Sequence, residues 1–138
     1  MFINPEKVNS GSVAKVCLAL AENIHRDGGV PVCFAAVDSV GELIYLHRMD
    51  GAPERLINIA IGKAYTAARM RVSTTAFKQR LIDEQLSLAD FLDVKFTSLP
   101  GGQPLFDNKQ LIGGIGVSGR TLEEDRVLCL QLVDSILS

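Results

Sequence analysis

The sequence predicts an α+β fold in which an antiparallel sheet is flanked by helices. Three observations support this class. The apolar patterns follow the order helix, hairpin, helices, hairpin, helix, which argues against alternating βαβ units. A continuous apolar run over residues 30–37 is typical of a strand that is covered on both faces. A glycine-rich strand over residues 111–118 precedes the last helix, and 138 residues suffice for a single domain, 1–138, with a sizeable core.

The first predicted helix is amphipathic and is followed by two glycines. Its apolar residues recur at helical spacing. Ser10 or Ser12 is the expected cap, and Gly28-Gly29 is expected to end the helix. His25 lies on the flank of the apolar stripe. The stripe consists of Val13, Val16, Cys17, Leu20 and Ile24, and the row that contains His25 consists of Ala14, Leu18 and Ala21.

A hairpin is predicted over residues 30–48. Pro31 stands at the start of its first strand, where a missing backbone donor is tolerated. Residues 38–41 form a tight turn in which glycine can adopt a positive φ. Residues 42–48 return as the second strand, and strict alternation places His47 on one face and Arg48 on the other.

The next predicted helix carries a face of small residues. Pro53 suits its first position. The small residues permit close packing against a sheet or a partner helix, and together with an apolar content of 47% they predict a homo-oligomer. Ser73 and Ser87 are expected to cap two further short helical segments. The face of the long helix consists of Ile57, Ala60, Ile61, Ala64 and Ala68.

Half of the chain's 12 glycines lie between Gly101 and Gly119. The run from Gly114 to Gly119 spells G-x-G-x-x-G, and Arg120 stands where a P-loop has lysine. A Rossmann motif needs a second strand beyond the following helix, but that helix uses nearly all of the remaining 19 residues. We therefore favour a structural role for these glycines over nucleotide binding.

In a strand, Gly114 and Gly116 share one face with Ile112 and Ser118. That face is nearly bare of side chains, so another backbone, a helix or a flat ligand can approach it closely. Asp107-Asn108 is the expected hairpin turn before this strand. The capping box Thr121-x-x-Glu124 opens the last helix, whose buried stripe is Cys129, Leu132, Val133 and Ile136.

Composition excludes several classes of function. A net charge of −2 does not indicate the basic surface that binds nucleic acid. No apolar run approaches 18 residues, so no membrane span is expected, and residues 1–6 lack the basic start of a signal peptide. We therefore expect a cytoplasmic protein. Cys17, Cys33 and Cys129 lie in apolar segments and are expected to be core thiols of a reducing compartment.

The usual catalytic patterns are also weak. Two histidines without ligand spacing do not predict a zinc site. A catalytic triad could in principle be assembled from Ser118, His47 and Asp38. We do not favour it, because the sequence around Ser118 lacks the G-x-S-x-G elbow. The acidic residues 123–125 are explained by the N-terminal end of the helix dipole.

Two blocks of sequence resemble the GlcG/HbpS-like haem-binding family, which includes the C-terminal domain of PduO-type proteins. The first block is P-G-G-x-P-L at 100–105, I-G-G-I-G-V-S-G at 112–119 and the acidic cluster that ends at Asp125. The second block comprises residues 31–38, 48–53 and 60–67. The resemblance covers most of residues 12–137. It implies a profilin-like α/β/α arrangement and a small-ligand-binding protein whose ligand is haem or a related tetrapyrrole.

The resemblance and the residues together give a set of candidate ligand-binding residues. His25 is the candidate iron ligand, because imidazole suits iron and an apolar wall suits a porphyrin. A histidine on the first helix is one choice of ligand within the family. Arg48 and Lys63 lie in the matching blocks and could bind propionates or another small carboxylate. Gly114 and Gly116 offer the bare face, and His47 is not assigned a role.

Three functions remain open at this point. The first is a cytoplasmic haem-binding or tetrapyrrole-binding protein, for which the resemblance implies a role near cobalamin-dependent diol or glycerol metabolism. The adenosyltransferase domain of PduO-type proteins has no counterpart in these 138 residues, so that activity is not carried over. The second is an enzyme that acts on a small carboxylic or hydroxy acid, with Arg48 or Lys63 as anchor. The third is an oligomeric accessory protein without a ligand of its own.

Overall fold

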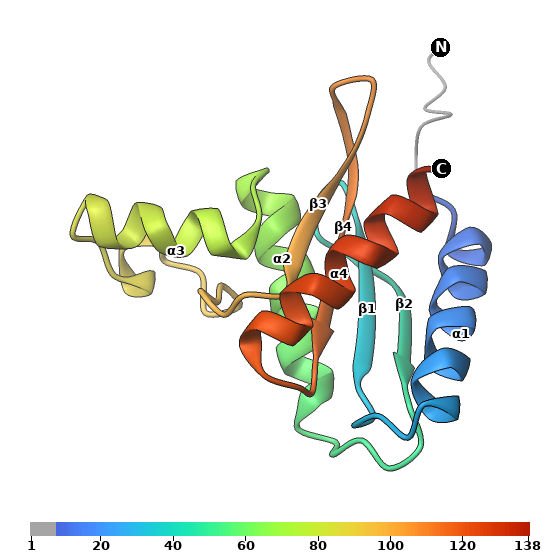
Figure 1. The fold of residues 1–138 in the computed structure, drawn as a ribbon. Coiled ribbons are helices and arrows are strands. Elements are labelled where there is room, and N and C mark those ends of the chain that lie inside the picture. Colours follow the sequence, from blue (N-terminus) through green and yellow to red (C-terminus); the bar gives the residue numbers. More distant parts are fainter. Residues whose placement is uncertain (1–7) are drawn as a thin grey trace.

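The computed structural model describes residues 8–138, in which a four-stranded antiparallel sheet lies between helices (Figure 1). The strands are β1 (Cys33–Asp38), β2 (Leu43–Arg48), β3 (Gly102–Asp107) and β4 (Gln110–Ser118), in the order β2-β1-β4-β3. Both hairpins that the sequence predicts are present, and β1 pairs with β4 at the centre of the sheet. Residues 1–6, on which the signal-peptide expectation depends, lie outside the described residues.

Helices cover both faces of this sheet. On one face lie α1 (Ser10–Arg26) and α4 (Leu122–Leu137), and on the other lies α2 (Leu56–Met70) (Figure 1). Strand β1 alternates between two cores, because Phe34 belongs to the cluster of α1 and α4 while Ala35 belongs to the cluster of α2. The α+β class and the layered arrangement are therefore confirmed. The apolar run of β1 is continuous because the strand is covered on both faces, as predicted.

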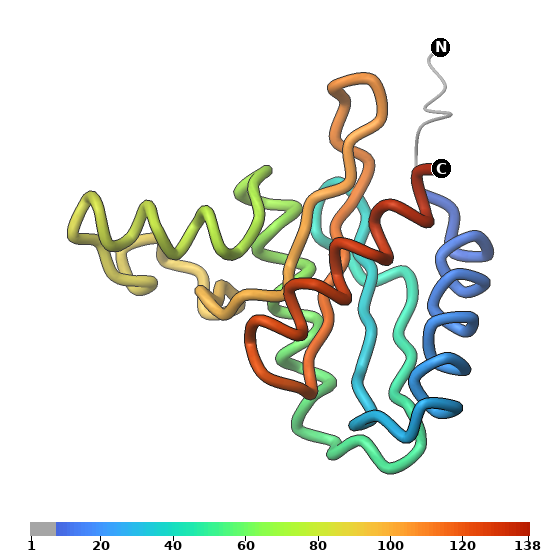
Figure 2. The backbone as a smooth tube through the Cα atoms, in the orientation of Figure 1, coloured from blue at the N-terminus to red at the C-terminus, as the bar shows by residue number. Residues whose placement is uncertain are grey.

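Helix α3 (Thr74–Asp83) and the 3-10 helix η1 (Leu88–Phe91) form an arm that extends away from the sheet. The backbone then runs back along the arm to β3 (Figure 2). Phe77, Phe91 and Phe96 hold the arm together by edge-to-face contacts, with ring centroids 5.2–5.9 Å apart. Phe96 also packs on Tyr65 of α2 at 5.8 Å, which anchors the arm to the body.

The bare face of β4 receives the backbone of α2. A Cβ atom added at Gly114 would stand 2.5 Å from the carbonyl oxygen of Ala64, and one added at Gly116 would clash with the carbonyl oxygen of Ala60. The close neighbour is therefore a helix of the same chain, and the prediction that these glycines bind a ligand is corrected. Ile112 does not share this face, because a register shift in the β3–β4 pairing places it in the core with Ile115.

The small residues of α2 face inward for the same reason. Ala60, Ala64 and Ala68 are buried against the sheet, so this face is not available to a partner helix. The homo-oligomer stays a prediction, but the face on which it was based is used within the chain. The three cysteines are buried and free, as expected. Within residues 8–138, no helix is long and apolar enough to cross a membrane.

Two predicted helix starts are corrected and two are confirmed. Asn9, and not Ser10 or Ser12, caps α1, because its Oδ1 accepts hydrogen bonds from the N–H groups of Gly11 and Ser12 at 2.8 and 3.1 Å. Helix α2 begins at Leu56 rather than at Pro53. Ser73 caps α3, and the Thr121–Glu124 capping box opens α4.

Candidate functional site

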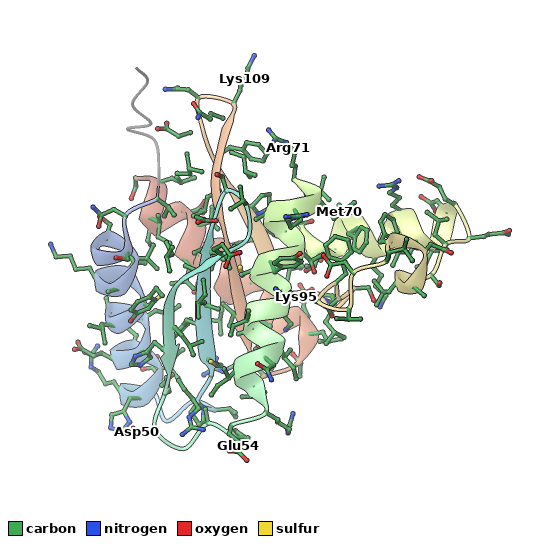
Figure 3. The ribbon with its side chains drawn as sticks, turned by 180° about the vertical axis from the view of Figure 1, so that it is seen from behind. Asp50, Glu54, Met70, Arg71, Lys95 and Lys109 are labelled. Carbon is green, nitrogen blue, oxygen red and sulfur yellow. The ribbon has the colours of Figure 1, made fainter. Side chains whose placement is uncertain are left out.

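An open groove of about 620 Å³ lies between α1 and the end of β2. Helix α1 forms one wall, and the last residues of β2 with the turn that follows form the other. Asp50, labelled in Figure 3, belongs to this turn. The residues that line the groove are Leu18, Ala21, Glu22, His25 and Arg26 from α1, and His47, Met49 and Asp50 from the opposite wall.

The surface of this groove is mainly apolar. Ala21 and Met49 are buried beneath it, and Leu18 leaves 47% of its surface exposed. Met49 is held in place because its sulfur accepts a hydrogen bond from the N–H of Val32 at 3.4 Å. An exposed leucine beside two buried apolar residues offers contact area to a flat hydrophobic ligand.

Both histidines of the chain line this one groove. His25 is exposed in the last turn of α1, as its place on the flank of the apolar stripe predicts. His47 is half-buried, and its ring lies against that of Phe34 with centroids 6.1 Å apart and planes inclined by 29°. Within residues 8–138, no side-chain hydrogen bond or salt bridge engages either imidazole. Their ring nitrogens are therefore available to a ligand.

Arg26 is the cation of the groove, and the sequence patterns did not single it out. Its Nη1 donates to Oδ1 of Asn23 at 3.0 Å, which leaves other guanidinium donors free for a carboxylate. The only signal in the sequence was its position beside His25, which is equally explained by the C-terminal end of the helix dipole. Glu22 and Asp50 supply negative charge on the two walls.

Arg48 does not reach the groove. In the β1–β2 pairing, Arg48 lies opposite Cys33, whose side chain packs in the α2 cluster. Arg48 therefore points to the α2 face of the sheet, and His47 points to the other face. This separation follows from the alternation of side chains along β2. The predicted role of Arg48 beside His25 is therefore corrected.

Lys63 is buried elsewhere in the fold. Its side chain is 1% exposed, and its Nζ donates to the carbonyl oxygen of Val117 at 2.8 Å and to Oδ2 of Asp125 at 3.1 Å. Burial lowers the pKa of Lys63 below its usual value, although the neighbouring Asp125 carboxylate opposes this shift. Lys63 has no exposed donor to offer a propionate, so its predicted role as a ligand-binding residue is also corrected.

The structure also describes the surroundings of the metal-ligating and nucleophilic side chains of residues 8–138. No group of three or more histidine, cysteine or acidic residues is placed to hold a metal ion there. Burial raises the pKa of the Cys17 thiol to about 12 and that of Cys33 to about 11, which keeps both protonated at neutral pH. Ser118 is buried, and its hydroxyl donates to the carbonyl oxygen of Leu56 at 2.8 Å, so it is not an exposed nucleophile.

A second groove of similar volume lies between α1 and α4. It contains no histidine or arginine, and Lys15 is its only charged lining residue. Volume alone therefore does not distinguish the two grooves. The first is preferred because it combines an apolar surface with unpaired imidazoles and a guanidinium.

Comparison with known proteins shows which family the chain resembles over most of its length. A family model described as "Haem degrading protein HbpS-like" matches residues 10–134. The uncharacterised 15.0 kDa protein of the dhaT-dhaS intergenic region of Citrobacter freundii is 31% identical, over 91% of this chain and 94% of that relative. Protein GlcG of Escherichia coli is 30% identical, over 79% of this chain and 80% of its own.

Solved structures share the whole fold. A structure described as a PduOC:heme complex has a TM-score of 0.81 and 25% sequence identity, and the match covers 94% of each chain. A double mutant of HbpS from Streptomyces reticuli has a TM-score of 0.83 and 25% identity, over 96% of this chain and 89% of that one. The similarity thus extends over both layers of helices and the sheet between them.

Proposed function

The chain belongs to the HbpS-like family, and from that premise we propose that it binds haem in the groove between α1 and β2, with His25 as an iron ligand. The observation that carries this proposal is an exposed imidazole without a partner in an apolar groove. Haem is the ligand chosen because the matching family is described as haem-degrading and one of the similar solved structures is a complex with heme.

The residues of the groove fit a porphyrin better than a bare metal ion. A metal ion alone would need three or four protein ligands, and residues 8–138 hold no such group. Haem carries four ligands of its iron in the macrocycle, so one or two imidazoles complete the coordination. When bound, haem would supply an iron centre that is capable of redox chemistry and of binding small molecules.

Each lining residue has a distinct part in this proposal. Leu18, Ala21 and Met49 provide the apolar contact for the macrocycle. His25 holds the iron, and Arg26 replaces Arg48 and Lys63 as the partner of a propionate, because its guanidinium lies in the same groove. Since the groove is open and His25 is exposed, water retains access to the ligand.

A haemin titration followed by absorption tests this function. Binding through imidazole is expected to shift the Soret band, and His25→Ala is expected to remove that shift and weaken binding. Lys15→Ala is the matched control, because Lys15 is exposed on the same helix but lines the second groove. If the wild-type protein leaves the haemin spectrum unchanged, haem binding is wrong. If His25→Ala binds with an unchanged spectrum, His25 is not the ligand.

The competing functions are separated by the same titration. An accessory protein without a ligand would give no spectral change. The enzyme for small acids has lost its named anchors, because Lys63 is buried in an ion pair and Arg48 lies on the other face from the groove. A panel of small hydroxy acids, scored by thermal shift, tests whether Arg26 serves in their place.

The cellular setting is part of the proposal and rests on the resemblance alone. A cytoplasmic role near cobalamin-dependent diol or glycerol metabolism is the setting implied by PduO-type C-terminal domains. Normal growth of a deletion strain on a diol and on glycerol would contradict the metabolic role. Recovery of the protein outside the cytoplasmic fraction would contradict the cytoplasmic location.

A further inference from the structure

Helix α4 carries apolar side chains on the side that faces away from the sheet. Figure 1 shows the helix across one face of the sheet, and no element of the described chain covers its outer side. Its inner side is buried through Asp125, Leu128, Cys129 and Leu132. The outer side holds three large apolar side chains that leave between 36% and 46% of their surface exposed, which are Val127, Leu130 and Leu137.

The spacing of this outer side is typical of helices that pack in pairs. The three apolar residues and one acidic residue are separated by three, four and three positions, which is the a/d pattern of a two-helix seam, in the order Val127, Leu130, Asp134 and Leu137. We propose that this α4 seam binds the same seam of a second copy of the chain, with the two helices antiparallel about a two-fold axis at Leu130. The contact goes beyond haem binding and does not depend on it.

The charges of the helix select a second copy as the partner. Asp134 is exposed, and in the described part of the chain no hydrogen bond or salt bridge engages its carboxylate. Arg126 stands eight residues earlier, about 12 Å along the helix, and pairs with Glu123 instead. Leu130 is four residues from each of these two charges. A two-fold axis at Leu130 therefore brings Arg126 of each copy opposite Asp134 of the other.

Arg126 has donors left for this contact. Its Nε and Nη2 donate to the two carboxylate oxygens of Glu123 at 2.8 and 2.6 Å. Its Nη1 makes no hydrogen bond to any residue from 8 to 138, so its two N–H groups can donate to a further carboxylate. Because Glu123 already holds the guanidinium, less side-chain entropy is lost when Asp134 of a second copy binds it.

A second copy supplies every feature that the seam needs. In an isologous contact the same patch serves on both subunits, so Leu130 meets its own counterpart and both charge pairs form together. An unrelated amphipathic helix would need a cation and an anion of its own, placed eight residues apart. The α4 seam is also separate from the arm, so copies joined through α4 keep their arms free for further contacts.

Charge exchange tests the two-fold contact by light scattering. Arg126→Glu is expected to lower the mass of the assembly toward that of the 14.9 kDa chain, because the new carboxylate would face the partner's Asp134. Asp134→Arg is expected to do the same, because the new guanidinium would face the partner's Arg126. An equimolar mixture of the two variants is expected to recover the wild-type mass, since each new charge then faces the opposite charge on the other chain.

A matched control and a second readout accompany this experiment. Lys109→Glu makes the same change of charge at the tip of the β3–β4 hairpin, labelled in Figure 3, and is expected to keep the wild-type mass. Leu130→Cys is expected to form a covalent dimer when an oxidant is added, because residue 130 meets its own copy at the axis. Val40→Cys, exposed in the β1–β2 turn, is expected to stay uncross-linked, and the three native cysteines are buried.

Two outcomes would overturn the proposal. The first is a wild-type protein that scatters as a single 14.9 kDa species. The second is a mixture of the two charge variants that stays as small as each variant alone, because α4 would then not face a second antiparallel α4. Circular dichroism establishes that each variant is folded before its mass is scored. The haemin titration is a separate measurement, so failure of haem binding leaves this contact standing.

Discussion

Lys63 and Asp125 join the two helical layers of the molecule. Lys63 belongs to α2, and Asp125 belongs to α4 on the other side of the sheet. A Cβ atom added at Gly101 would stand 2.9 Å from the lysine Nζ, and one at Gly116 would stand 3.1 Å from its Cβ, so these glycines leave room for the lysine side chain. Several residues that carry the family resemblance therefore build one buried ion pair.

Removal of one partner of this pair is expected to be strongly destabilising. Lys63→Met leaves the buried Asp125 carboxylate without a counter-charge, which costs about 3–5 kcal/mol of the free energy of unfolding. Lys63→Met/Asp125→Leu is expected to recover part of this loss, because no charge is then left buried. The measurement is urea unfolding of both variants at pH 7. A double variant that is less stable than Lys63→Met would contradict the account.

Recovery should be incomplete because Asp125 has a second contact. Its Oδ1 accepts a hydrogen bond from the N–H of Arg120 at 3.0 Å. The sequence predicted Lys63 as a ligand-binding cation and not as a buried one, although Lys63 lies three residues after Ala60 on the inner face of α2. It could not indicate the partner, because Asp125 is 62 residues away and its charge is equally explained by the helix N-terminus.

At the scale of elements, the glycines of β4 set the distance between the sheet and α2. The helix approaches so closely that its carbonyl groups occupy the place of side chains at Gly114 and Gly116. Ala60, Ala64 and Ala68 supply the matching small surface on the helix. Each side of this contact was visible in the sequence, but their pairing was not, because a bare strand face fits a ligand as well as a helix.

A single methyl group at this contact is expected to separate the two elements. Gly116→Ala should lower the free energy of unfolding by about 1–3 kcal/mol, because the backbone of α2 must move to accommodate it. Gly62→Ala is the milder comparison on α2, because its new Cβ would stand 3.3 Å from the carbonyl oxygen of Lys95 and would need a much smaller shift than the Cβ at Gly116. Equal thermal stability of Gly116→Ala and wild type would contradict the close packing.

The boundaries of elements show where patterns in the sequence fail. Strict alternation along β2 would place Ile44 on the face of Leu46 and Arg48, but a register shift opposite Ala36 and Val37 brings Ile44 into the core of α1 and α4. Bulges of this kind insert a residue without changing the hydrophobic composition, so periodicity does not reveal them. His47 lies outside this shift and pairs in register with Phe34, but no pattern in the sequence indicated that it shares a wall of the groove with Met49 and Asp50.

At the scale of the whole molecule, the layered body was predictable and the arm was not. The body follows from hydrophobic patterns, since each strand and helix must bury its apolar face against another layer. The arm is held by Phe77, Phe91 and Phe96, which lie up to 19 residues apart and show no common period. Its projection from the sheet is therefore a tertiary property that local patterns do not encode (Figure 1).

Large apolar side chains are exposed where the arm returns to α2, on either side of Asp93, which accepts a hydrogen bond from Tyr65 of α2. Leu92 is 93% exposed and Val94 is 102% exposed, although both lie between Phe91 and Phe96 of the aromatic cluster in the sequence. Leu92 also has a φ of 55°, a left-handed conformation that leucine rarely adopts. Because burial of exposed apolar side chains against a partner is favourable, the predicted homo-oligomer is expected to use this part of the arm.

Light scattering of the purified protein at micromolar concentration measures the mass of the assembly directly. Wild type is expected to have a mass above that of the 14.9 kDa chain, and Leu92→Ser/Val94→Ser is expected to shift the population toward 14.9 kDa. Ile82→Ser is the matched control, since Ile82 is 60% exposed on α3 but keeps a helical backbone. A single 14.9 kDa species for wild type would rule out the oligomer, and an unchanged mass for the double variant would place the interface away from these two residues.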